Sequence, residues 1–246
     1  MSDAVLVTGA AAGLGQTIAG HLLTQGFRVV FADLNGEQAQ AALEAAGGHR
    51  DNALALALDI RDPERFQQAI DQAHRHFGAL HGLVNNAALT LTTPVMEISV
   101  DEFDQVMTTN LRGTFVGCQT AGRYFSEQGY GRIINLASLA GQNGGTASGA
   151  HYAASKGGIL TLTRVFARAL GGAGVTVNAI APGPMDLPSV HAAVPPERMT
   201  DLLAMIPVGQ LGEPGFVARA VALLASRDAS FVTGATWDIN GGIYMR

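Results

Sequence analysis

The chain has 246 residues, of which 48% are hydrophobic and 14% charged, a composition that supports one large core in a single domain over 1–246. Its formal net charge of -5, without a lysine- or arginine-rich run, argues against a nucleic-acid surface. Apolar stretches are interrupted by Gly, Asn, Ser and Pro, so no membrane span is expected. The N-terminal segment lacks the basic region of a signal peptide, and we expect a cytoplasmic protein.

Short apolar runs alternate with longer segments of helical pattern. The runs are mostly continuous, as is typical of strands covered on both faces. We therefore predict an α/β fold: a doubly wound, Rossmann-type parallel seven-stranded sheet with helices on both faces. The expected strands are 4–9, 28–33, 53–59, 82–87, 132–138, 175–183 and 235–241. The expected helices are 13–25, 36–46, 62–77, 99–128, 152–171 and 213–225, where 99–128 holds either two helices or one long helix with a break near Gly113.

One segment breaks this alternation. Residues 184–211 follow a strand and are rich in proline, leucine, methionine and valine, with a short helical pattern. A long apolar insertion at a strand end is typical of a functional loop. We expect a lid over the substrate here.

The first strand runs into the glycine-rich sequence TGAAAGLG, from Thr8 to Gly15. Gly9 permits a sharp turn, and Gly13 and Gly15 allow backbone to approach a pyrophosphate at the N-terminus of the following helix. The spacing is GxxxGxG. A glycine-rich turn alone is also compatible with a purely structural role.

Asp33 supports the nucleotide interpretation. It ends the second strand, where a carboxylate can accept hydrogen bonds from the adenosine ribose and repels a 2′-phosphate. No Lys or Arg follows it closely, and Ala12 precedes Gly13. The sequence therefore predicts NAD rather than NADP, with Asp59 at the adenine edge and NNAA at 85–88 in the same crevice.

Tyr152 and Lys156 stand four residues apart in HYAASKGG. A free tyrosine has a pKa of about 10, which is too high for a base at neutral pH. An ammonium about 4 Å away supplies roughly 4 kcal/mol toward the phenolate at an effective dielectric of ~20. A lysine at i+4 can stand there, so we expect Lys156 to lower the pKa of Tyr152.

Together the motifs TGAAAGLG, LDI, NNAA, TTNLRG, INLASLAG, YAASK and APG, with Asp33, resemble the short-chain dehydrogenase/reductase family over nearly the whole chain. This resemblance implies that Tyr152 is the general acid/base and that Lys156 bonds the nicotinamide ribose. It also implies that Ser138 holds the substrate oxygen and that Asn110 holds a water that relays protons.

The resemblance also implies where cofactor and substrate bind. Two positions depart from the family pattern: Leu187 replaces a threonine that bonds the nicotinamide carboxamide, and Ala88 replaces a glycine. The expected cofactor residues are Gly9, Ala12, Gly13, Leu14, Gly15, Asp33, Leu34, Asp59, Ile60, Asn86, Ala87, Ala88, Tyr152, Lys156, Pro182, Gly183 and Met185, and the expected substrate-lining residues are Ala140, Asn143, His151 and Leu187.

The chain is most similar in look to the 3-oxoacyl-carrier-protein reductase branch, whose members form tetramers. That branch usually prefers NADPH and commonly docks its acidic carrier through two arginines, where this chain has Gly129 and Ala173. We therefore expect an NAD(H)-dependent enzyme that interconverts a small, neutral secondary alcohol and a ketone, as a homotetramer. A 3-oxoacyl-carrier-protein reductase and a non-catalytic nucleotide-binding regulator remain alternatives. An epimerase usually carries an additional substrate domain, which this chain lacks.

Several further side chains have more ordinary interpretations. The single cysteine, Cys118, excludes an intrachain disulfide, suits a reducing compartment and lies in an apolar stretch typical of a buried thiol. His74, His76 and His81 surround the end of a surface helix without a carboxylate at ligand spacing, so we expect solvated histidines and no metal. His151 is expected to line the site or to be structural.

Overall fold

A parallel sheet forms the centre of the molecule. The computed structural model describes residues 2–145 and 149–246. The strands are β1 (Ala4–Thr8), β2 (Arg28–Asp33), β3 (Ala53–Ala57), β4 (Gly82–Asn85), β5 (Gly131–Leu136), β6 (Val175–Pro182) and β7 (Thr236–Ile239). Their spatial order is β3-β2-β1-β4-β5-β6-β7, and every pairing is parallel. The predicted seven-stranded Rossmann-type sheet is confirmed.

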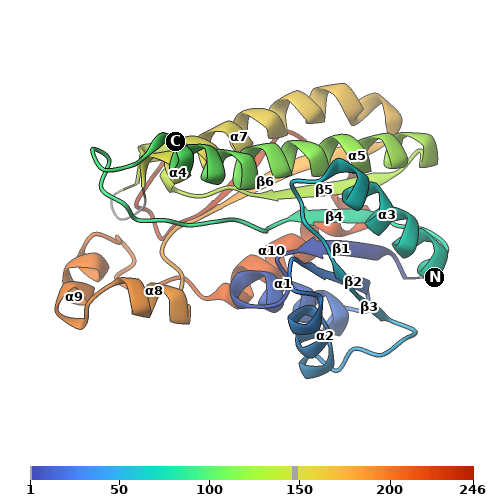
Figure 1. Cartoon of the computed structure of the whole chain (residues 1–246), viewed down its shortest axis with the longest axis horizontal. Coiled ribbons are helices and arrows are strands. Elements are labelled where there is room, and N and C mark those ends of the chain that lie inside the picture. The colour runs from blue at the N-terminus through green and yellow to red at the C-terminus, as the bar shows by residue number, and fades with distance from the viewer. Residues whose placement is uncertain (1, 146–148) are drawn as a thin grey trace.

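Helices cover both faces of this sheet (Figure 1). On one side lie α1 (Gly13–Thr24), α2 (Gly36–Ala45) and α10 (Pro214–Ala225). On the other lie α3 (Pro63–Phe77), α5 (Gly113–Gln128) and α7 (Ala150–Leu170). The remaining helices are α4 (Val100–Met107), α6 (Ala140–Asn143), α8 (Pro188–Ala193) and α9 (Pro196–Ala204), with two 3-10 turns at Gly171–Ala173 and Arg227–Phe231.

The strand sequences are continuously apolar because each strand contributes to two hydrophobic cores. On β1, Val5 and Val7 belong to the core beneath α1 and α10, whereas Ala4 and Leu6 belong to the core beneath α3 and α5. All four side chains are at most 1% exposed. β1 pairs in parallel with β2 on one side and β4 on the other, so it is a central strand covered on both faces.

The expected helix at 99–128 is two helices joined by a π-helical turn. α4 ends at Met107, Thr108–Arg112 forms the π turn, and α5 begins at Gly113. Gly113 is needed where the helices join, since a Cβ there would lie 2.7 Å from Cδ1 of Ile60. The predicted break near Gly113 is therefore confirmed, and the π turn buries Asn110.

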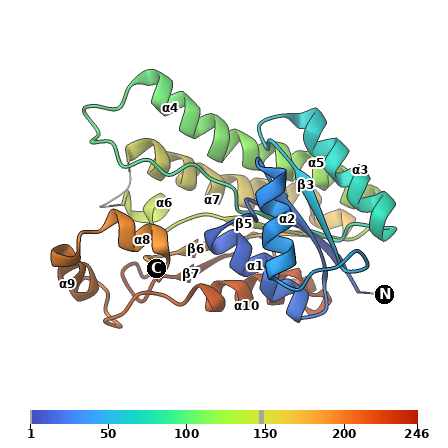
Figure 2. The ribbon, with the colours of Figure 1, turned by 60° about the horizontal axis from the view of Figure 1, so that its bottom comes forward.

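The expected lid at 184–211 contains α8 and α9, which lie to one side of the sheet in Figure 2. Backbone hydrogen bonds close its base. Asp186 N–H donates to the carbonyl of Gly212 at 2.8 Å, and Gly212 N–H donates to the carbonyl of Pro184 at 2.9 Å. The segment therefore leaves and rejoins the body at adjacent points. Over the described ranges, no helix has the length and apolarity that crossing a membrane requires.

Candidate active site

The carboxyl ends of the strands surround a cavity of about 890 Å³. It opens where β1 and β4 are neighbours, which is where the order of the sheet reverses direction along the chain. Ligands of doubly wound sheets bind at such a switch point. The expected site residues that line it are Gly9, Ala12, Gly13, Leu14, Gly15, Asp33, Leu34, Asp59, Ile60, Asn86, Ala87, Ala88, Ser138, Ala140, Asn143, Tyr152, Lys156, Pro182, Gly183, Met185 and Leu187.

The turn between β1 and α1 is shaped to admit backbone closely. Gly9 has a φ of 66°, and a Cβ on it would lie 2.8 Å from Cα of Ala87. Gly13 has a φ of 57° and begins α1. The N-cap residue, Ala12, has no polar side chain that could bond the first N–H groups of this helix. The first turn of α1 borders the cavity, and free N–H groups at a helix N-terminus suit the binding of a pyrophosphate. The residues present therefore fit a dinucleotide.

Asp33 lies beside this turn. Its Oδ2 accepts a hydrogen bond from the N–H of Ala11 at 3.1 Å, and its Oδ1 accepts from the N–H of Asn35 at 3.2 Å. The next side chain, Leu34, is 70% exposed and also lines the cavity. An anionic group and an apolar group therefore occupy the end of β2, where a 2′-phosphate would need cations.

Arg61 is a lining residue that the sequence analysis did not identify. It lies near Asp59, and its Nη2 is 2.7 Å from Oδ2 of that carboxylate. This pairing holds the pKa of Asp59 below its ordinary value. The positive charge of Arg61 is thus already engaged by a carboxylate next to the expected adenine site.

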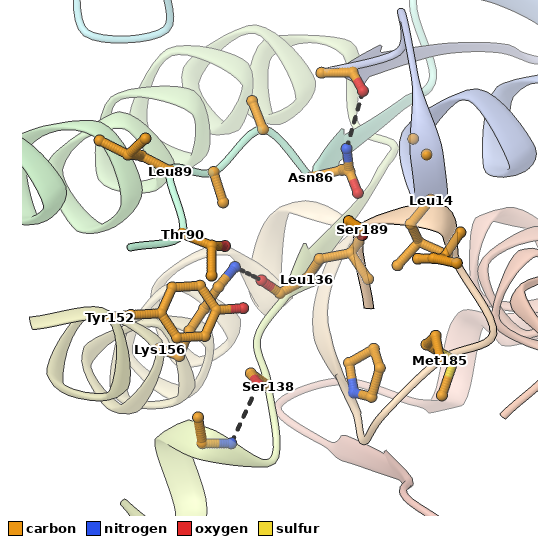
Figure 3. Close-up of a pocket in the computed structure, with 18 of the residues that line it drawn as sticks. Leu14, Asn86, Leu89, Thr90, Leu136, Ser138, Tyr152, Lys156, Met185 and Ser189 are labelled. Atoms are coloured by element: carbon orange, nitrogen blue, oxygen red, sulfur yellow. Dashed lines mark hydrogen bonds between the residues drawn. The ribbon is translucent and has the colours of Figure 1, made fainter. Parts of the chain in front are cut away.

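Asn86 joins β4 to the glycine-rich turn. Its Nδ2 donates to the carbonyl oxygens of Thr8 at 2.9 Å and Gly9 at 3.2 Å. The hydroxyl of Thr8 accepts from the N–H groups of Asn86 at 3.0 Å and Ala87 at 3.1 Å. These contacts fix both sides of the switch point relative to each other (Figure 3).

Tyr152 and Lys156 point into the cavity from the first turns of α7 (Figure 3). Nζ of Lys156 donates to the carbonyl of Leu136, at the end of β5, at 2.6 Å. The same nitrogen lies 5.6 Å from the centroid of the Tyr152 ring. Burial lowers the pKa of Lys156 to about 8.

We expect from the sequence that Lys156 lowers the pKa of Tyr152, but in the structure this pKa is raised. Burial raises the pKa of Tyr152, and hydrogen bonding to the hydroxyls of Ser138 and Thr90 acts in the opposite direction. The ammonium of Lys156 is bonded to the carbonyl of Leu136 and lies behind the ring of Tyr152. The phenol is therefore held protonated by its surroundings.

Ser138 is the second residue after β5, and its hydroxyl reaches the cavity beside Tyr152 (Figure 3). Its Oγ accepts a hydrogen bond from the N–H of Ala140, at the start of α6, at 3.1 Å. α6 packs tightly on α7, since a Cβ on Gly141 would lie 2.5 Å from the carbonyl carbon of Lys156. This close approach explains why glycine stands at position 157, directly after Lys156.

Asn110 does not line the cavity. Its Oδ1 accepts from the N–H of Leu89 at 2.7 Å, and its Nδ2 donates to the carbonyl of Leu89 at 2.9 Å and to Oγ of Ser155 at 3.1 Å. The π turn brings the carboxamide to this position. Asn110 thus ties the loop after β4 to α7, and the proton-relay role expected of it stays a prediction.

The expectation that His151 lines the substrate site is corrected by the structure. Its ring is fully buried and absent from the cavity wall, because it turns back onto the N-terminus of α7 and toward Glu102 of α4. Leu187 does line the cavity. Ser189, two residues later, also lines it and supplies a hydroxyl that Leu187 lacks (Figure 3).

Thr90 and Glu102 are further residues that sequence reasoning missed. Thr90 lies in the loop after β4 and lines the cavity beside Tyr152 (Figure 3), and hydrogen bonding to its hydroxyl lowers the pKa of Tyr152. Its only signal in the sequence is its place shortly after NNAA. Glu102 has no local signal, because its partner His151 is 49 residues later in the chain.

The three outlying histidines make separate contacts. Nδ1 of His74 is 2.8 Å from the hydroxyl of Tyr124, and Nε2 of His76 is 2.7 Å from the carbonyl of Arg50. Nδ1 of His81 accepts from the N–H of Ala4 at 3.0 Å. Cys118 is buried, as expected, and burial raises the pKa of its thiol to about 12.

A seven-stranded Rossmann-type sheet with a serine, a tyrosine and a lysine in its switch-point cavity defines a class of nicotinamide dinucleotide oxidoreductases. The chain belongs to the short-chain dehydrogenase/reductase family: residues 9–244 match the family model described as enoyl-(acyl carrier protein) reductase. It is similar to the 3-oxoacyl-[acyl-carrier-protein] reductase of Vibrio cholerae, at 38% identity over 98% of this chain and 96% of that one. The enzyme of the same name from Staphylococcus aureus is 36% identical over 100% and 99% of the two chains. D-threitol dehydrogenase of Mycolicibacterium smegmatis is 38% identical over 98% and 92%.

Proposed function

We propose that this oxidoreductase uses NAD(H) to interconvert a secondary alcohol and a ketone, with Tyr152 as general acid/base. The observation that carries the reaction type is the convergence of Ser138, Tyr152 and Lys156 in one cavity with the glycine-rich turn. The cofactor supplies or accepts the hydride. The protein must hold the substrate oxygen and move one proton, and these three side chains provide both functions.

In the reductive direction the raised pKa of Tyr152 is an advantage. A phenol that is protonated at neutral pH can donate its proton to the oxygen that forms as the ketone accepts hydride. The hydroxyl of Ser138 can donate to the same oxygen, since it lies beside the phenol. Lys156, held by the carbonyl of Leu136, stands behind the tyrosine and can stabilise the phenolate that remains.

The cofactor preference follows from the end of β2. Asp33 and Leu34 line the cavity there, and a carboxylate repels a 2′-phosphate. The only lining arginine, within the described part of the chain, is Arg61, which is paired with Asp59. We therefore assign NAD(H) rather than NADP(H) to the site.

Two substrate classes compete. A small neutral alcohol is supported by the apolar lid residues Leu187, Val190 and Leu202, and by Gly129 and Ala173 where a carrier-docking enzyme has arginines. A 3-oxoacyl group on a carrier protein is supported by the comparisons, which favour it over the small alcohol because two of the relatives described above carry that name. The name of the third relative, D-threitol dehydrogenase, supports a polyol.

Initial rates decide between these classes. Purified protein is assayed with NADH and with NADPH on a 3-oxoacyl thioester of pantetheine, the same acyl group on a carrier protein, and small neutral ketones. NADH should be preferred over NADPH on every substrate that turns over. Higher kcat/KM on the carrier-linked substrate than on neutral ketones would select the reductase of acyl chains, and the reverse order would select the small-alcohol enzyme. No turnover of any substrate would leave the nucleotide-binding regulator.

We further propose that 1–246 acts as one catalytic unit with residues 184–211 as its lid, and that the enzyme works as a homotetramer. The lid proposal is supported by Leu187, Ser189 and Leu202, which reach the cavity from this segment. Sedimentation of the purified protein tests the oligomer, and a single peak at the mass of the monomer would reject it.

A further inference from the structure

His151 is the second residue of α7 and directly precedes Tyr152. Its ring is fully buried, and both ring nitrogens are in hydrogen bonds. Nδ1 lies 2.9 Å from the backbone nitrogen of Tyr152, and Nε2 lies 2.8 Å from Oε1 of Glu102 on α4. The ring therefore joins the helix that carries the tyrosine to a second helix.

These contacts define where the ring proton is. A backbone N–H can only donate, so Nδ1 of His151 must offer its lone pair to Tyr152. The proton of the neutral ring then lies on Nε2, where the carboxylate of Glu102 accepts it. Glu102 thus selects the tautomer that can receive the Tyr152 N–H.

Among the residues that the structure describes, no other side chain is bonded to the N–H groups of the first turn of α7. Its N-cap is Gly149, which has no side chain, so the N–H groups of the first turn rely on later residues. A Cβ on Gly149 would overlap with Cε1 of His151, which means that the ring packs directly on this backbone. Gly149 N–H in turn donates to the carbonyl of Leu91 at 3.0 Å.

Glu102 is held from a second direction. Hydrogen bonding to Thr93 comes first, and to His151 second, among the causes that hold the pKa of Glu102 below its ordinary value. Thr93 and Leu91 both belong to the loop after β4, as does Thr90, which lines the cavity beside Tyr152 (Figure 3). One continuous set of contacts therefore runs from this loop through Glu102 and His151 to the backbone of Tyr152.

We propose that His151 and Glu102 are positioning residues: they fix the backbone of Tyr152, and with it the phenol, relative to the loop that holds Thr90. The inference rests on the proposed function in assigning the acid/base role to Tyr152. The positioning itself is a geometric claim about the tyrosine and is measurable without turnover. Misplacement of a reacting group by about 1 Å costs up to 10²-fold in rate, so a loss of this anchor should reduce kcat more than KM.

Two substitutions of the histidine separate its two contacts. His151→Asn places an amide oxygen near the position of Nδ1, so it can still accept from Tyr152 N–H, but it is too short to reach Glu102. His151→Gln places its amide near Nε2, so it can reach Glu102 but offers no acceptor at Nδ1. Glu102→Gln retains an acceptor for the ring N–H, whereas Glu102→Leu removes it. Asp104→Asn, exposed on α4, is the control for charge.

Three measurements are made on each variant: kcat and KM on the best substrate, the thermal unfolding midpoint, and the NMR signal of tyrosine Cζ in protein labelled with ¹³Cζ-tyrosine. Tyr152→Phe identifies the signal of Tyr152. We expect His151→Gln and Glu102→Leu to lower kcat about tenfold or more with KM within about twofold, and to shift or broaden the Tyr152 signal. Glu102→Gln and Asp104→Asn should remain near wild type in both, whereas His151→Asn, which keeps the acceptor for Tyr152 N–H but loses Glu102, should fall between wild type and His151→Gln.

The proposal is overturned if the Tyr152 signal is unchanged in both His151→Gln and Glu102→Leu, whether or not the unfolding midpoint falls. It is also overturned if the two histidine variants lose kcat equally and in proportion to their lost stability. If one variant does not fold, the other still reports on the tyrosine. Should the wild type turn over no alcohol or ketone, the proposed function fails while the NMR signal still decides the positioning role.

Discussion

Lys156 lies one helical turn after Tyr152 on α7, and its Nζ is 5.6 Å from the centre of the tyrosine ring while it donates to the carbonyl of Leu136. The ammonium is therefore fixed by the end of β5 and not by the phenol. Its effect on Tyr152 is that of a nearby charge behind the ring. Tyr152 and Lys156 project from the same face of α7, but the carbonyl at the end of β5 determines where the ammonium of Lys156 lies.

Replacing Tyr152 by phenylalanine removes the hydroxyl that would carry the proton. General acid/base groups contribute about 10²–10⁴-fold to rate, so kcat should fall by about that factor. Binding of NADH, measured by fluorescence titration, should stay within a few-fold, because the ring still fills its place. Turnover near the wild-type rate in this variant would remove Tyr152 from the mechanism.

The rate should depend on pH in opposite ways in the two directions. Ketone reduction needs the protonated phenol, and the raised pKa of Tyr152 keeps it protonated at neutral pH, so kcat/KM should be flat there and fall in alkali. Alcohol oxidation needs the phenolate, so its kcat/KM should rise with pH. Ammonium at Lys156, whose pKa is about 8, is lost over the same alkaline range and will flatten the rise.

Thr90→Val tests the cause of this pH dependence. The Thr90 hydroxyl lowers the pKa of Tyr152, so its removal should move the oxidation limb to higher pH without changing the overall shape. Full profiles of kcat/KM in both directions measure the limb. A limb that stays in place, or moves to lower pH, would contradict the role given to Thr90.

Cofactor preference should respond to the end of β2. Asp33→Ser combined with Leu34→Arg replaces the carboxylate by a hydroxyl and adds a cation, so kcat/KM with NADPH relative to NADH should rise by about tenfold or more. Glu37→Gln, exposed in the first turn of α2, changes the charge of the same region and should leave the ratio unchanged. A wild-type enzyme that already prefers NADPH would refute the assignment.

Two glycines of α1 should respond oppositely to alanine. A Cβ on Gly15 would overlap with the carbonyl oxygen of Gly9, so Gly15→Ala should destabilise the fold by about 1–3 kcal/mol and weaken NADH binding. A Cβ on Gly20 meets only the Cβ of Ala46, at 3.7 Å, so Gly20→Ala should stabilise by about 0.5–1 kcal/mol. Denaturant unfolding of both variants measures the difference; equal effects would show that the close approach at Gly15 is not limiting.

The fold could be predicted from the sequence because it rests on local patterns. Continuous apolar runs such as 28–33 mark strands covered on both faces, and the helix starts at Asn35 and Asp62 carry side-chain caps. The short helix α6 was not predicted, since four residues carry too little periodicity. The cavity residues of the glycine-rich turn were predicted because their spacing reflects backbone geometry.

The contacts made by His151 and Asn110 could not be predicted in the same way. Each depends on a partner from another element, Glu102 for the histidine and the backbone of Leu89 for the asparagine. Nothing near either residue in the sequence indicates that partner. The direction of the Tyr152 pKa shift could not be predicted from the spacing to Lys156, because it depends on burial of the tyrosine by other elements.

The π turn at Thr108–Arg112 makes α4 and α5 one rod with an extra residue in it. Every α4 side chain is therefore rotated by about 100° from where an unbroken helix would place it. Glu102 on α4 contacts His151 in this phase, and Asn110, within the π turn itself, contacts Leu89. This stretch can consequently accept many exchanges of residue type, but its length is fixed: deletion of a single residue would turn Glu102 away from the helix that carries Tyr152.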